Sequence, residues 1–334
     1  KTSETLALDN INFTIKDKEY ISIIGPSGCG KSTILGIISN IIPKSGGKII
    51  FNKENPTIGY MLQEDSLFPW KTILENCLLG LEITKRLNKK TKQRAIELLT
   101  TYGLKDFMNK YPSSLSGGMR QRASLIRTLV LDPDILLLDE PFAAIDAKVR
   151  QELRSWLKEM IEKLGVTSIF VTHDQDEAIE VADEIIITNH GKIEQKGSPI
   201  VRYQKTQTAF TASFFGQASF VDDYSKFSTF KKIDGADKAI IRPEFLDVTK
   251  KNENQKYKSS AAEGVVERVA FRGDNTELTI AVNGTKLTAK RTLNEAEVRV
   301  GEKVDVFVYK IFVTKGNSVY ILDNEAINED SFII

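Results

Sequence analysis

Residues 25–33 constrain the fold of this chain more than any other segment. They read Gly-Pro-Ser-Gly-Cys-Gly-Lys-Ser-Thr, which fits the pattern G-x-x-x-x-G-K-[ST], and they lie between an apolar run and a helical pattern. Glycines let backbone N–H groups surround phosphate oxygens, and the start of the following helix favours negative charge. The sequence therefore predicts a nucleotide site whose phosphates contact Gly25, Pro26, Ser27, Gly28, Cys29, Gly30, Lys31, Ser32 and Thr33.

Two carboxylates end a second apolar run. Residues 135–138 read Ile-Leu-Leu-Leu and are followed by Asp139 and Glu140. A continuous apolar run is typical of a central strand covered on both faces. Next to a phosphate loop, Asp139 and the Ser32 hydroxyl would hold Mg²⁺, and Lys31 would reach the β- and γ-phosphates. Glu140 points elsewhere and would polarise the attacking water.

The order of patterns along the 334 residues predicts two domains. Strand and helix patterns alternate over residues 1–216, with a mainly helical stretch at about 67–130, which indicates a mostly parallel sheet with helices on it. Residues 217–235 are aperiodic and predict a linker. Residues 236–334 predict a small all-β domain with a hairpin turn at Asn283-Gly284. We expect strands at residues 11–15, 20–24, 48–51, 57–61, 134–138, 167–172, 184–188, 239–242, 263–270, 277–282, 286–289 and 303–313.

Composition narrows the partners. Lys plus Arg total 46 and Asp plus Glu total 45, a balance that argues against a nucleic-acid partner. Cys29 and Cys77 lack metal-ligand spacing, which suits a reducing cytosol. No apolar run approaches the roughly 20 residues that span a bilayer, and we see no signal peptide. A membrane role would therefore come through a partner.

A third motif identifies the family. Residues 115–122 read Leu-Ser-Gly-Gly-Met-Arg-Gln-Arg and lie between the phosphate loop and the Asp-Glu strand. In this order the motifs resemble those of the ATP-binding-cassette (ABC) ATPases. The resemblance implies an α/β fold: a P-loop NTPase cassette with a mixed sheet core and a helical subdomain, followed by an all-β, OB-like domain.

The same resemblance assigns further site residues. It implies that Gln63 links Mg²⁺ and the attacking water to the helical subdomain, that His173 contacts the γ-phosphate, and that Asp146 crosses a dimer interface. It also implies that Ser116, Gly117 and Gly118 contact a nucleotide held by another chain. We expect Ser116 to cap the helix that begins near Gly118. The motifs depart from the family at Met119 and Ala143, and the usual adenine-stacking aromatic would fall at or before Lys1.

Two segments resemble different branches of the family. Residues 65–72, with Pro69-Trp70, look like the nitrate/sulfonate/taurine importer ATPases, where this pair faces the groove for the permease's coupling helix. Residues 197–199 and 214–216 and the run Arg242-Pro243-Glu244 resemble sulfate, polyamine, iron and sugar importer ATPases that carry a C-terminal TOBE domain. The sequence predicts a small anion of the first type and leaves the second group open.

The implied function is ATP binding and hydrolysis that drives solute uptake. The expected partners are a second ATPase subunit, as a homodimer or a related pair, a transmembrane permease and, indirectly, a solute-binding protein. The expected location is the cytoplasmic face of the membrane. One rival is a soluble ABC protein of DNA repair or chromosome structure, which would separate the motifs by a long coiled coil. The others are a translation factor, which would carry two cassettes, and a binding module without catalysis.

Overall fold

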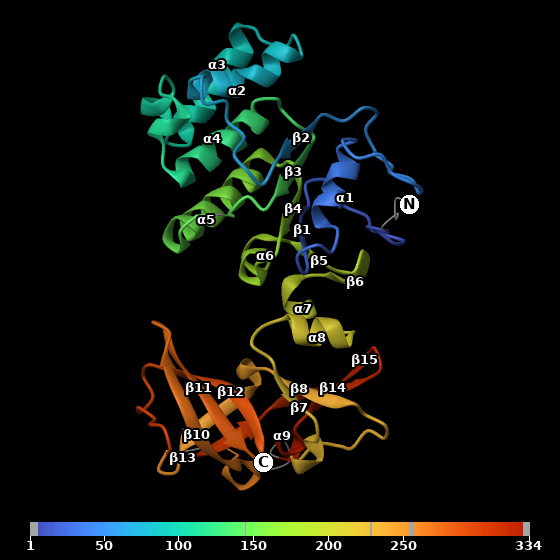
Figure 1. Ribbon diagram of the computed structural model, residues 1–334, viewed down its shortest axis with the longest axis vertical. Coiled ribbons are helices and arrows are strands. Elements are labelled where there is room, and N and C mark those ends of the chain that lie inside the picture. Colours follow the sequence, from blue (N-terminus) through green and yellow to red (C-terminus); the bar gives the residue numbers. More distant parts are fainter. Residues whose placement is uncertain (1–5, 144, 228, 254–256, 330–334) are drawn as a thin grey trace, which may run out of the picture. The chain divides into compact units, whose positions relative to one another are not determined.

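The computed structural model describes residues 6–143, 145–227, 229–253 and 257–329. The chain divides into two compact units, Lys1–Arg202 and Tyr203–Ile334 (Figure 1). The division falls before residue 216, where the sequence predicts the end of the first domain. The reason is that helix α8 (Ala209–Phe214) belongs to the second unit, where Ala212 packs against Ile240 and Phe312.

Six strands form the sheet of the first unit in the order β2-β3-β4-β1-β5-β6. The first five run parallel, and β6 pairs antiparallel with β5. Because parallel strands place their carboxyl ends at one edge, the loops after β1, β3 and β4 meet there. The strands are β1 (Tyr20–Ile24), β2 (Ile58–Met61), β3 (Ile135–Asp139), β4 (Thr167–Thr172), β5 (Glu184–Asn189) and β6 (Lys192–Gly197).

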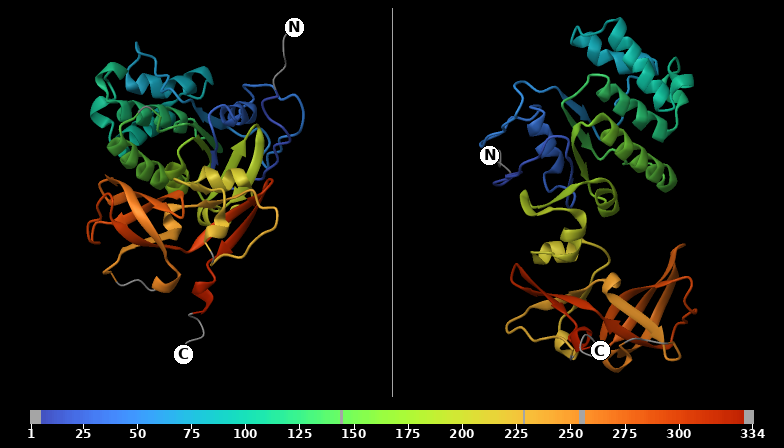
Figure 2. Two further views of the ribbon diagram at one scale, coloured as in Figure 1. Left: turned by 60° about the horizontal axis from the view of Figure 1, so that its bottom comes forward. Right: turned by 180° about the vertical axis from the view of Figure 1, so that it is seen from behind.

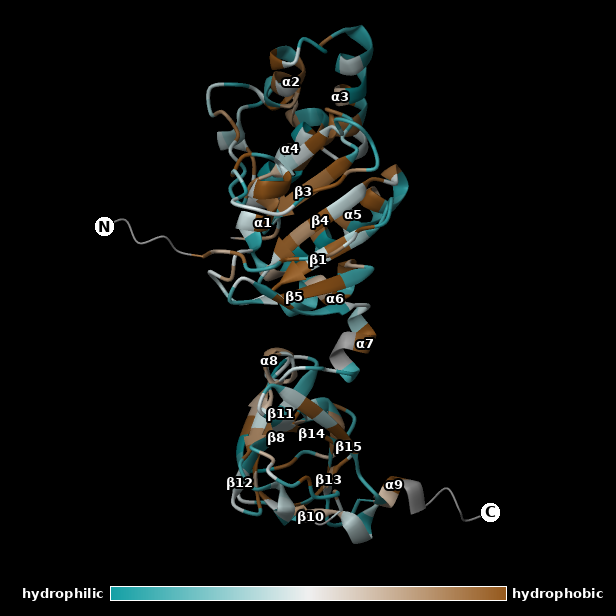
Figure 3. Ribbon diagram, turned by 90° about the vertical axis from the view of Figure 1, so that its right-hand side faces the viewer, coloured by the Kyte–Doolittle hydropathy of each residue, from teal (hydrophilic) through white to brown (hydrophobic). Residues whose placement is uncertain are grey.

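Helices cover both faces of this sheet. Alternate residues of β3 point to opposite faces. Leu136 and Leu138 pack in one cluster with residues of α5 (Ala147–Leu164), whereas Leu137 packs in another with residues of α1 (Lys31–Ile38). The central strands β3, β4 and β1 are accordingly mostly hydrophobic (Figure 3). Two covered faces explain why the run at 135–138 is continuous rather than alternating. Helix α6 (Gln175–Val181) also belongs to this region, whereas α7 (Pro199–Gln204) spans the boundary between the two units.

Three helices build the helical subdomain, which lies at one end of the unit (Figures 1 and 2). Its core joins Ile73, Leu99 and Ile126, one from each helix. Thr72 begins the first helix with a capping box, because its hydroxyl accepts from Glu75 N and the Glu75 carboxylate accepts from Thr72 N. The helices are α2 (Ile73–Ile83), α3 (Lys89–Thr101) and α4 (Gly117–Leu129), with short 3₁₀ turns η1 (Lys105–Phe107) and η2 (Pro112–Ser114).

Two predicted strands are wrong, since residues 11–15 and 48–51 form no strand, and the strand predicted at 303–313 is divided into β13 (Lys303–Val308) and β14 (Lys310–Lys315), which belong to different sheets. At 11–15 the alternating side chains Ile11, Phe13 and Ile15 are partly buried against the α1 side of the sheet, but their backbone joins no ladder. At 48–51 Ile50 is 84% exposed. The alternating pattern at residues 11–15 therefore indicates buried side chains correctly. It does not make a strand, because a strand also requires a neighbouring strand with which its backbone can pair.

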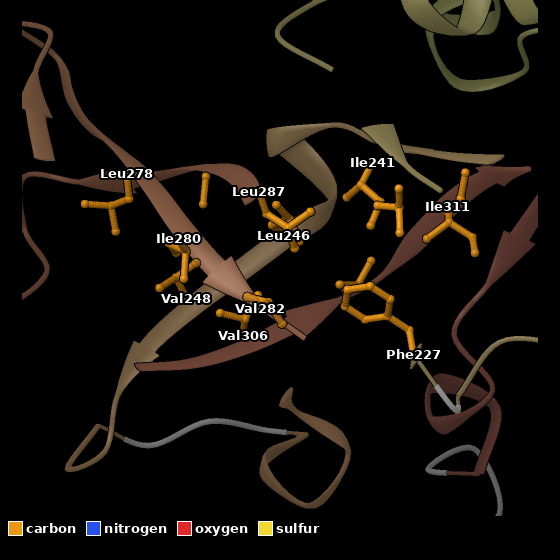
Figure 4. Close-up of a cluster of buried hydrophobic side chains, with 14 of the residues drawn as sticks. Phe227, Ile241, Leu246, Val248, Leu278, Ile280, Val282, Leu287, Val306 and Ile311 are labelled. Carbon is orange, nitrogen blue, oxygen red and sulfur yellow. The ribbon is translucent and has the colours of Figure 1, made fainter. Parts of the chain in front are cut away.

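The second unit contains two antiparallel sheets, of order β12-β11-β10-β13-β9 and β15-β14-β8-β7. Inward side chains from both sheets form one core, to which Leu278, Val306 and Ile311 belong (Figure 4). Asn283 and Gly284 both have positive φ, 50° and 78°, which is what a type I′ turn at the predicted hairpin requires. The strands are β7 (Ser219–Val221), β8 (Lys238–Ile241), β9 (Leu246–Lys250), β10 (Ala262–Phe271), β11 (Asn275–Val282), β12 (Thr285–Thr292), β13 (Lys303–Val308), β14 (Lys310–Lys315) and β15 (Ser318–Asp323); the helical turns are η3 (Tyr224–Lys226), η4 (Pro243–Phe245), η5 (Lys258–Ser260) and α9 (Ala326–Glu329).

Residues 217–235, predicted as a linker, form part of this β-unit. Strand β7 pairs with β8, and four side chains spaced three residues apart lie in the core. That spacing fits neither the period of a strand nor that of an α-helix, which is why the segment reads as aperiodic. The four buried residues are Val221, Tyr224, Phe227 and Phe230.

Candidate active site

The phosphate loop joins β1 to α1 at the carboxyl edge of the sheet. Gly30 caps α1 with a φ of 98°, a conformation that favours glycine. Gly25 is needed for a different reason, since a Cβ there would lie 2.2 Å from the Thr188 carbonyl oxygen. The thiol of Cys29 is buried 3.2 Å from the Thr188 hydroxyl, so Cys29 packs as a small side chain within the loop.

Lys31 lies folded against this loop. Its Nζ donates to the carbonyl oxygens of Gly25 at 2.9 Å and Pro26 at 3.0 Å, and the side chain is buried. The positively charged ammonium group is therefore held against the phosphate loop, and this loop leads into the N-terminus of α1. Both features favour an anion.

Ser32 and Asp139 form a pair of oxygen donors beside Lys31. The Ser32 hydroxyl donates to Asp139 Oδ1 at 2.9 Å, and the Tyr60 hydroxyl donates to Oδ2 at 3.1 Å. Burial raises the pKa of Asp139 above its usual range, although both hydrogen bonds act in the opposite direction. A buried carboxylate next to a hydroxyl is a donor set that suits Mg²⁺, because the cation prefers oxygen ligands and offsets the buried charge. Nothing in the sequence pattern indicated a role for Tyr60.

Glu140 lies between Gln63 and His173. Gln63 Nε2 donates to Glu140 Oε2 at 3.0 Å, and His173 Nδ1 lies 3.1 Å from Glu140 Oε1. Glu140 has a φ of 44°, an uncommon conformation for a residue other than glycine, and its N–H donates to the Val171 carbonyl at 2.9 Å. The fold thus brings together three residues that the sequence separates by 77 and 33 positions.

Ser116 caps α4, as the sequence predicts. Its hydroxyl accepts from Met119 N at 3.4 Å, and the helix begins at Gly117. At Gly118 a Cβ would lie 2.5 Å from Val149 Cγ1, so glycine allows α4 to approach α5. The start of α4 therefore presents a capped helix end with two glycines, which is a suitable anion site.

Two arginines near these motifs make contacts that no pattern in the sequence predicts. Arg120 Nε pairs with Asp65 at 3.0 Å, and Arg127 donates to the carbonyl oxygens of Asp65 and Ser66. Helix α4, named the signature helix below because it carries the motif at residues 115–122, thereby holds the segment that follows Gln63.

Asp146 caps α5, accepting from Val149 N at 3.0 Å, and the first turn of that helix carries Arg150. The neighbouring Ala144 of the predicted Ala-Ala-Ile-Asp motif lies outside the described residues.

A phosphate loop, a paired hydroxyl and carboxylate for a cation, and a carboxylate beside a histidine define a P-loop nucleoside triphosphatase. A family model for ABC transporters matches residues 8–143, and a TOBE domain model matches residues 239–308. The chain belongs to the ABC transporter family, among its import ATP-binding proteins, and it is an ATPase. The predicted family, fold class and enzyme class are confirmed.

Two kinds of relatives support this assignment. The sulfate/thiosulfate import ATP-binding protein CysA of Synechocystis sp. is 38% identical over 289 residues, covering 82% of this chain and 80% of the relative. The spermidine/putrescine import ATP-binding protein PotA of Desulfitobacterium hafniense is 39% identical over 290 residues, covering 82% and 83%. These names favour the resemblance to the sulfate, polyamine, iron and sugar importer ATPases. The predicted nitrate/sulfonate/taurine-like substrate is therefore not supported.

A solved structure gives the same fold for the cassette. The dimeric, post-hydrolysis state of the ATP-binding cassette MJ0796, bound to ADP and phosphate, has a TM-score of 0.52 at 32% identity. It covers 60% of this chain and 94% of that chain. Among the residues that the structure describes, no helix is long and apolar enough to cross a membrane.

Proposed function

We propose that this chain is the ATPase subunit of an importer on the cytoplasmic face of the membrane. Two ATPase subunits would close on ATP and open after hydrolysis, and a partner permease would convert that motion into solute uptake. The observation that carries the proposal is the hydrogen-bonded cluster of Glu140 with Gln63 and His173, directly after Asp139. It combines a candidate general base with groups from two neighbouring strands that orient it.

Each residue has a role that follows from its position. Lys31 and the backbone N–H groups of residues 25–33 other than Pro26 would bind the phosphates, since Lys31 already lies against the loop. Glu140 would accept the proton of the attacking water, and Gln63 would orient that water. His173 would hold Glu140 and contact the γ-phosphate.

Ser32, Asp139 and Gln63 would hold Mg²⁺. When bound, the cation would neutralise charge on the phosphate oxygens. Among the described residues, no group of three or more His, Cys, Asp or Glu side chains could hold a metal ion. Nucleotide phosphates would therefore complete the ligand shell, which explains why Mg²⁺ and ATP would bind together.

The second subunit would complete each site. Ser116, Gly117 and Gly118 would face the γ-phosphate bound by Lys31 of the other copy, and Asp146 would cross the interface. The capped helix end supports this role, since the N–H groups at the start of a helix favour an anion. The dimeric cassette MJ0796, similar to this chain in fold, supports a dimer as the working state.

The permease would dock near Trp70. This side chain is 69% exposed and its ring centroid lies 5.2 Å from that of Phe68, which gives an aromatic surface suited to an amphipathic helix. Asp65, in the same segment, pairs with Arg120 of the signature helix. A movement of this segment, caused by the permease at Trp70, would therefore be transmitted to both Gln63 and the signature helix.

Sulfate or thiosulfate is the first candidate solute and a polyamine the second, following the names of the relatives. Because the solute does not contact the ATPase in this scheme, the test requires the permease that co-purifies with the chain. Vesicles that carry the complex in their membrane, with ATP inside and the solute-binding protein outside, should accumulate radiolabelled sulfate. Uptake of spermidine without uptake of sulfate would reverse the order.

Glu140→Gln tests the site itself. The variant should bind ATP normally and lose turnover by about 10²–10⁴-fold, the usual contribution of a general base. Glu82→Gln, an exposed carboxylate of α2, is the matched control and should retain wild-type activity. ATP hydrolysis at the wild-type rate in Glu140→Gln would overturn the assignment of Glu140.

A further inference from the structure

Arg150 connects two segments of the site that are distant in sequence. It lies in the first turn of α5, one turn after the cap residue Asp146. Its Nη2 donates to the Ile145 carbonyl at 3.0 Å, its Nη1 lies 3.5 Å from Asp174 Oδ2, and its Nε lies 4.0 Å from Glu177 Oε1. One guanidinium therefore contacts the segment before α5 and the start of α6.

The carboxylates that Arg150 contacts follow His173 directly in the chain, at the cap and in the first turn of α6. Asp174 caps this helix by accepting from the N–H groups of Asp176 and Glu177. The Thr172 hydroxyl donates to Glu177 at 2.5 Å and accepts from Asp174 N at 3.0 Å. The backbone on both sides of His173 is thus held by groups that Arg150 pairs with.

The geometry of these contacts favours arginine over lysine at this position. Glu177 is only 4% exposed, and burial raises the pKa of its carboxyl group, while the hydrogen bond from Thr172 and the positive charges of Arg150 and Arg154 lower it. A planar guanidinium can donate to a carbonyl and face carboxylates at the same time, which a single ammonium group cannot do in the same geometry. The substitution Arg150→Lys would therefore keep the charge and lose part of the geometry.

We propose that Arg150 is a positioning residue that couples the segment around Asp146 to His173. The inference rests on the proposed function, which places Asp146 at the dimer contact and His173 at the γ-phosphate. Movement of residues 145 and 146 when a second subunit docks would shift Arg150, and through Asp174 and Glu177 it would shift His173. Hydrolysis would thereby depend on dimer closure without any direct contact between His173 and the partner.

Arg154 supplies a matched control. It lies one turn further along α5, its side chain is more buried than that of Arg150, and it pairs with Glu180 of the same helix α6 at 3.3 Å. In the importer complex, Arg150→Met should lower kcat about 10- to 100-fold, a loss typical of misplaced catalytic groups, with KM for ATP within about twofold of wild type. Arg150→Lys should recover part of kcat, and Arg154→Met should change it by less than about threefold. Equal losses in Arg150→Met and Arg154→Met, or full recovery by lysine, would overturn the proposal.

A double-mutant cycle tests whether Arg150 acts through His173. If it does, Arg150→Met combined with His173→Ala should have a kcat within about twofold of His173→Ala alone. Multiplied losses would indicate a separate structural role and would refute the inference. Glu140→Gln distinguishes a failure of the proposed active site from a failure of the role of Arg150. If Glu140→Gln retains turnover, the proposed site is rejected. If Glu140→Gln is inactive but the losses of Arg150→Met and His173→Ala multiply, only the role of Arg150 is rejected.

Discussion

Gly118→Ala tests the close approach of the signature helix to α5. A Cβ at this position would lie 2.5 Å from Val149 Cγ1 and 3.7 Å from Leu153 Cδ1. The first distance is far below van der Waals contact. Valine in a helix is largely restricted to one χ1 rotamer, so Val149 cannot turn its methyl group away at low cost. The substitution must therefore move one helix relative to the other.

The expected loss of stability is small but measurable. Overpacking typically costs about 1–3 kcal/mol, whereas alanine in place of glycine gains up to about 1 kcal/mol in helix propensity. The net loss is therefore about 1 kcal/mol, which lowers Tm by roughly 2–4 °C for a unit of this size. Gly117→Ala is the control, because a Cβ there would meet no atom within 4 Å.

Tryptophan fluorescence in urea is a suitable assay. Both tryptophans, Trp70 and Trp156, lie in the first unit, so their signal reports its unfolding. Val149→Ala should destabilise the unit by loss of packing, but it removes the methyl group that the new Cβ would strike. The free energy of unfolding of the double variant Gly118→Ala/Val149→Ala should therefore fall by about 1 kcal/mol less than the sum of the losses in the two single variants. Losses that add within about 0.5 kcal/mol would refute the contact as the reason for glycine.

Three further substitutions address other parts of the chain. Ser116→Arg should leave nucleotide binding to the single chain intact and prevent ATP-dependent dimerisation, measured by size-exclusion chromatography in the Glu140→Gln background; a normal dimer would contradict the role of Ser116. Asp139→Asn should raise the Tm of the nucleotide-free protein at pH 7, because burial raises the pKa of Asp139 and so penalises its charged form. That penalty is absent below the unfolded pKa of about 4 and grows as pH rises through the folded pKa, so an equal advantage at pH 4 and pH 7 would refute the explanation. Gly284→Ala should destabilise the second unit by about 1–2 kcal/mol in calorimetry, because residue 284 has a φ of 78°, whereas Asn283→Gly should be tolerated.

The parts of the fold that sequence predicts are those that local chemistry determines. The phosphate loop requires glycine, lysine and hydroxyl residues at set spacings, so β1, the loop and the start of α1 follow directly from residues 20–33. Asn283-Gly284 similarly predicts its hairpin, because few residues adopt positive φ twice in succession. The order of motifs then predicts the cassette.

The parts that sequence does not predict depend on contacts between distant residues. Phe13 and Ile15 alternate like strand residues, yet nothing local shows that their backbone lacks a partner. Tyr60 reaches Asp139 across 79 positions, and Arg120 reaches Asp65 across 55, and neither contact could be foreseen from a motif. The buried residues Val221, Tyr224, Phe227 and Phe230 recur every three residues, a period that belongs only to 3₁₀-helices, which rarely extend beyond four residues, so the spacing predicted no element.

The left-handed backbone at Glu140 has a consequence for engineering. Side chains with a Cβ are disfavoured at a φ of 44°, by about 1–2 kcal/mol relative to glycine. A screen that rewards heat resistance alone would therefore enrich Gly or Asn at position 140, and the survivors would be robust proteins that no longer turn over ATP. Libraries of this chain should be sorted for hydrolysis in the same round as thermal tolerance, since a sequential scheme would discard its most useful members first.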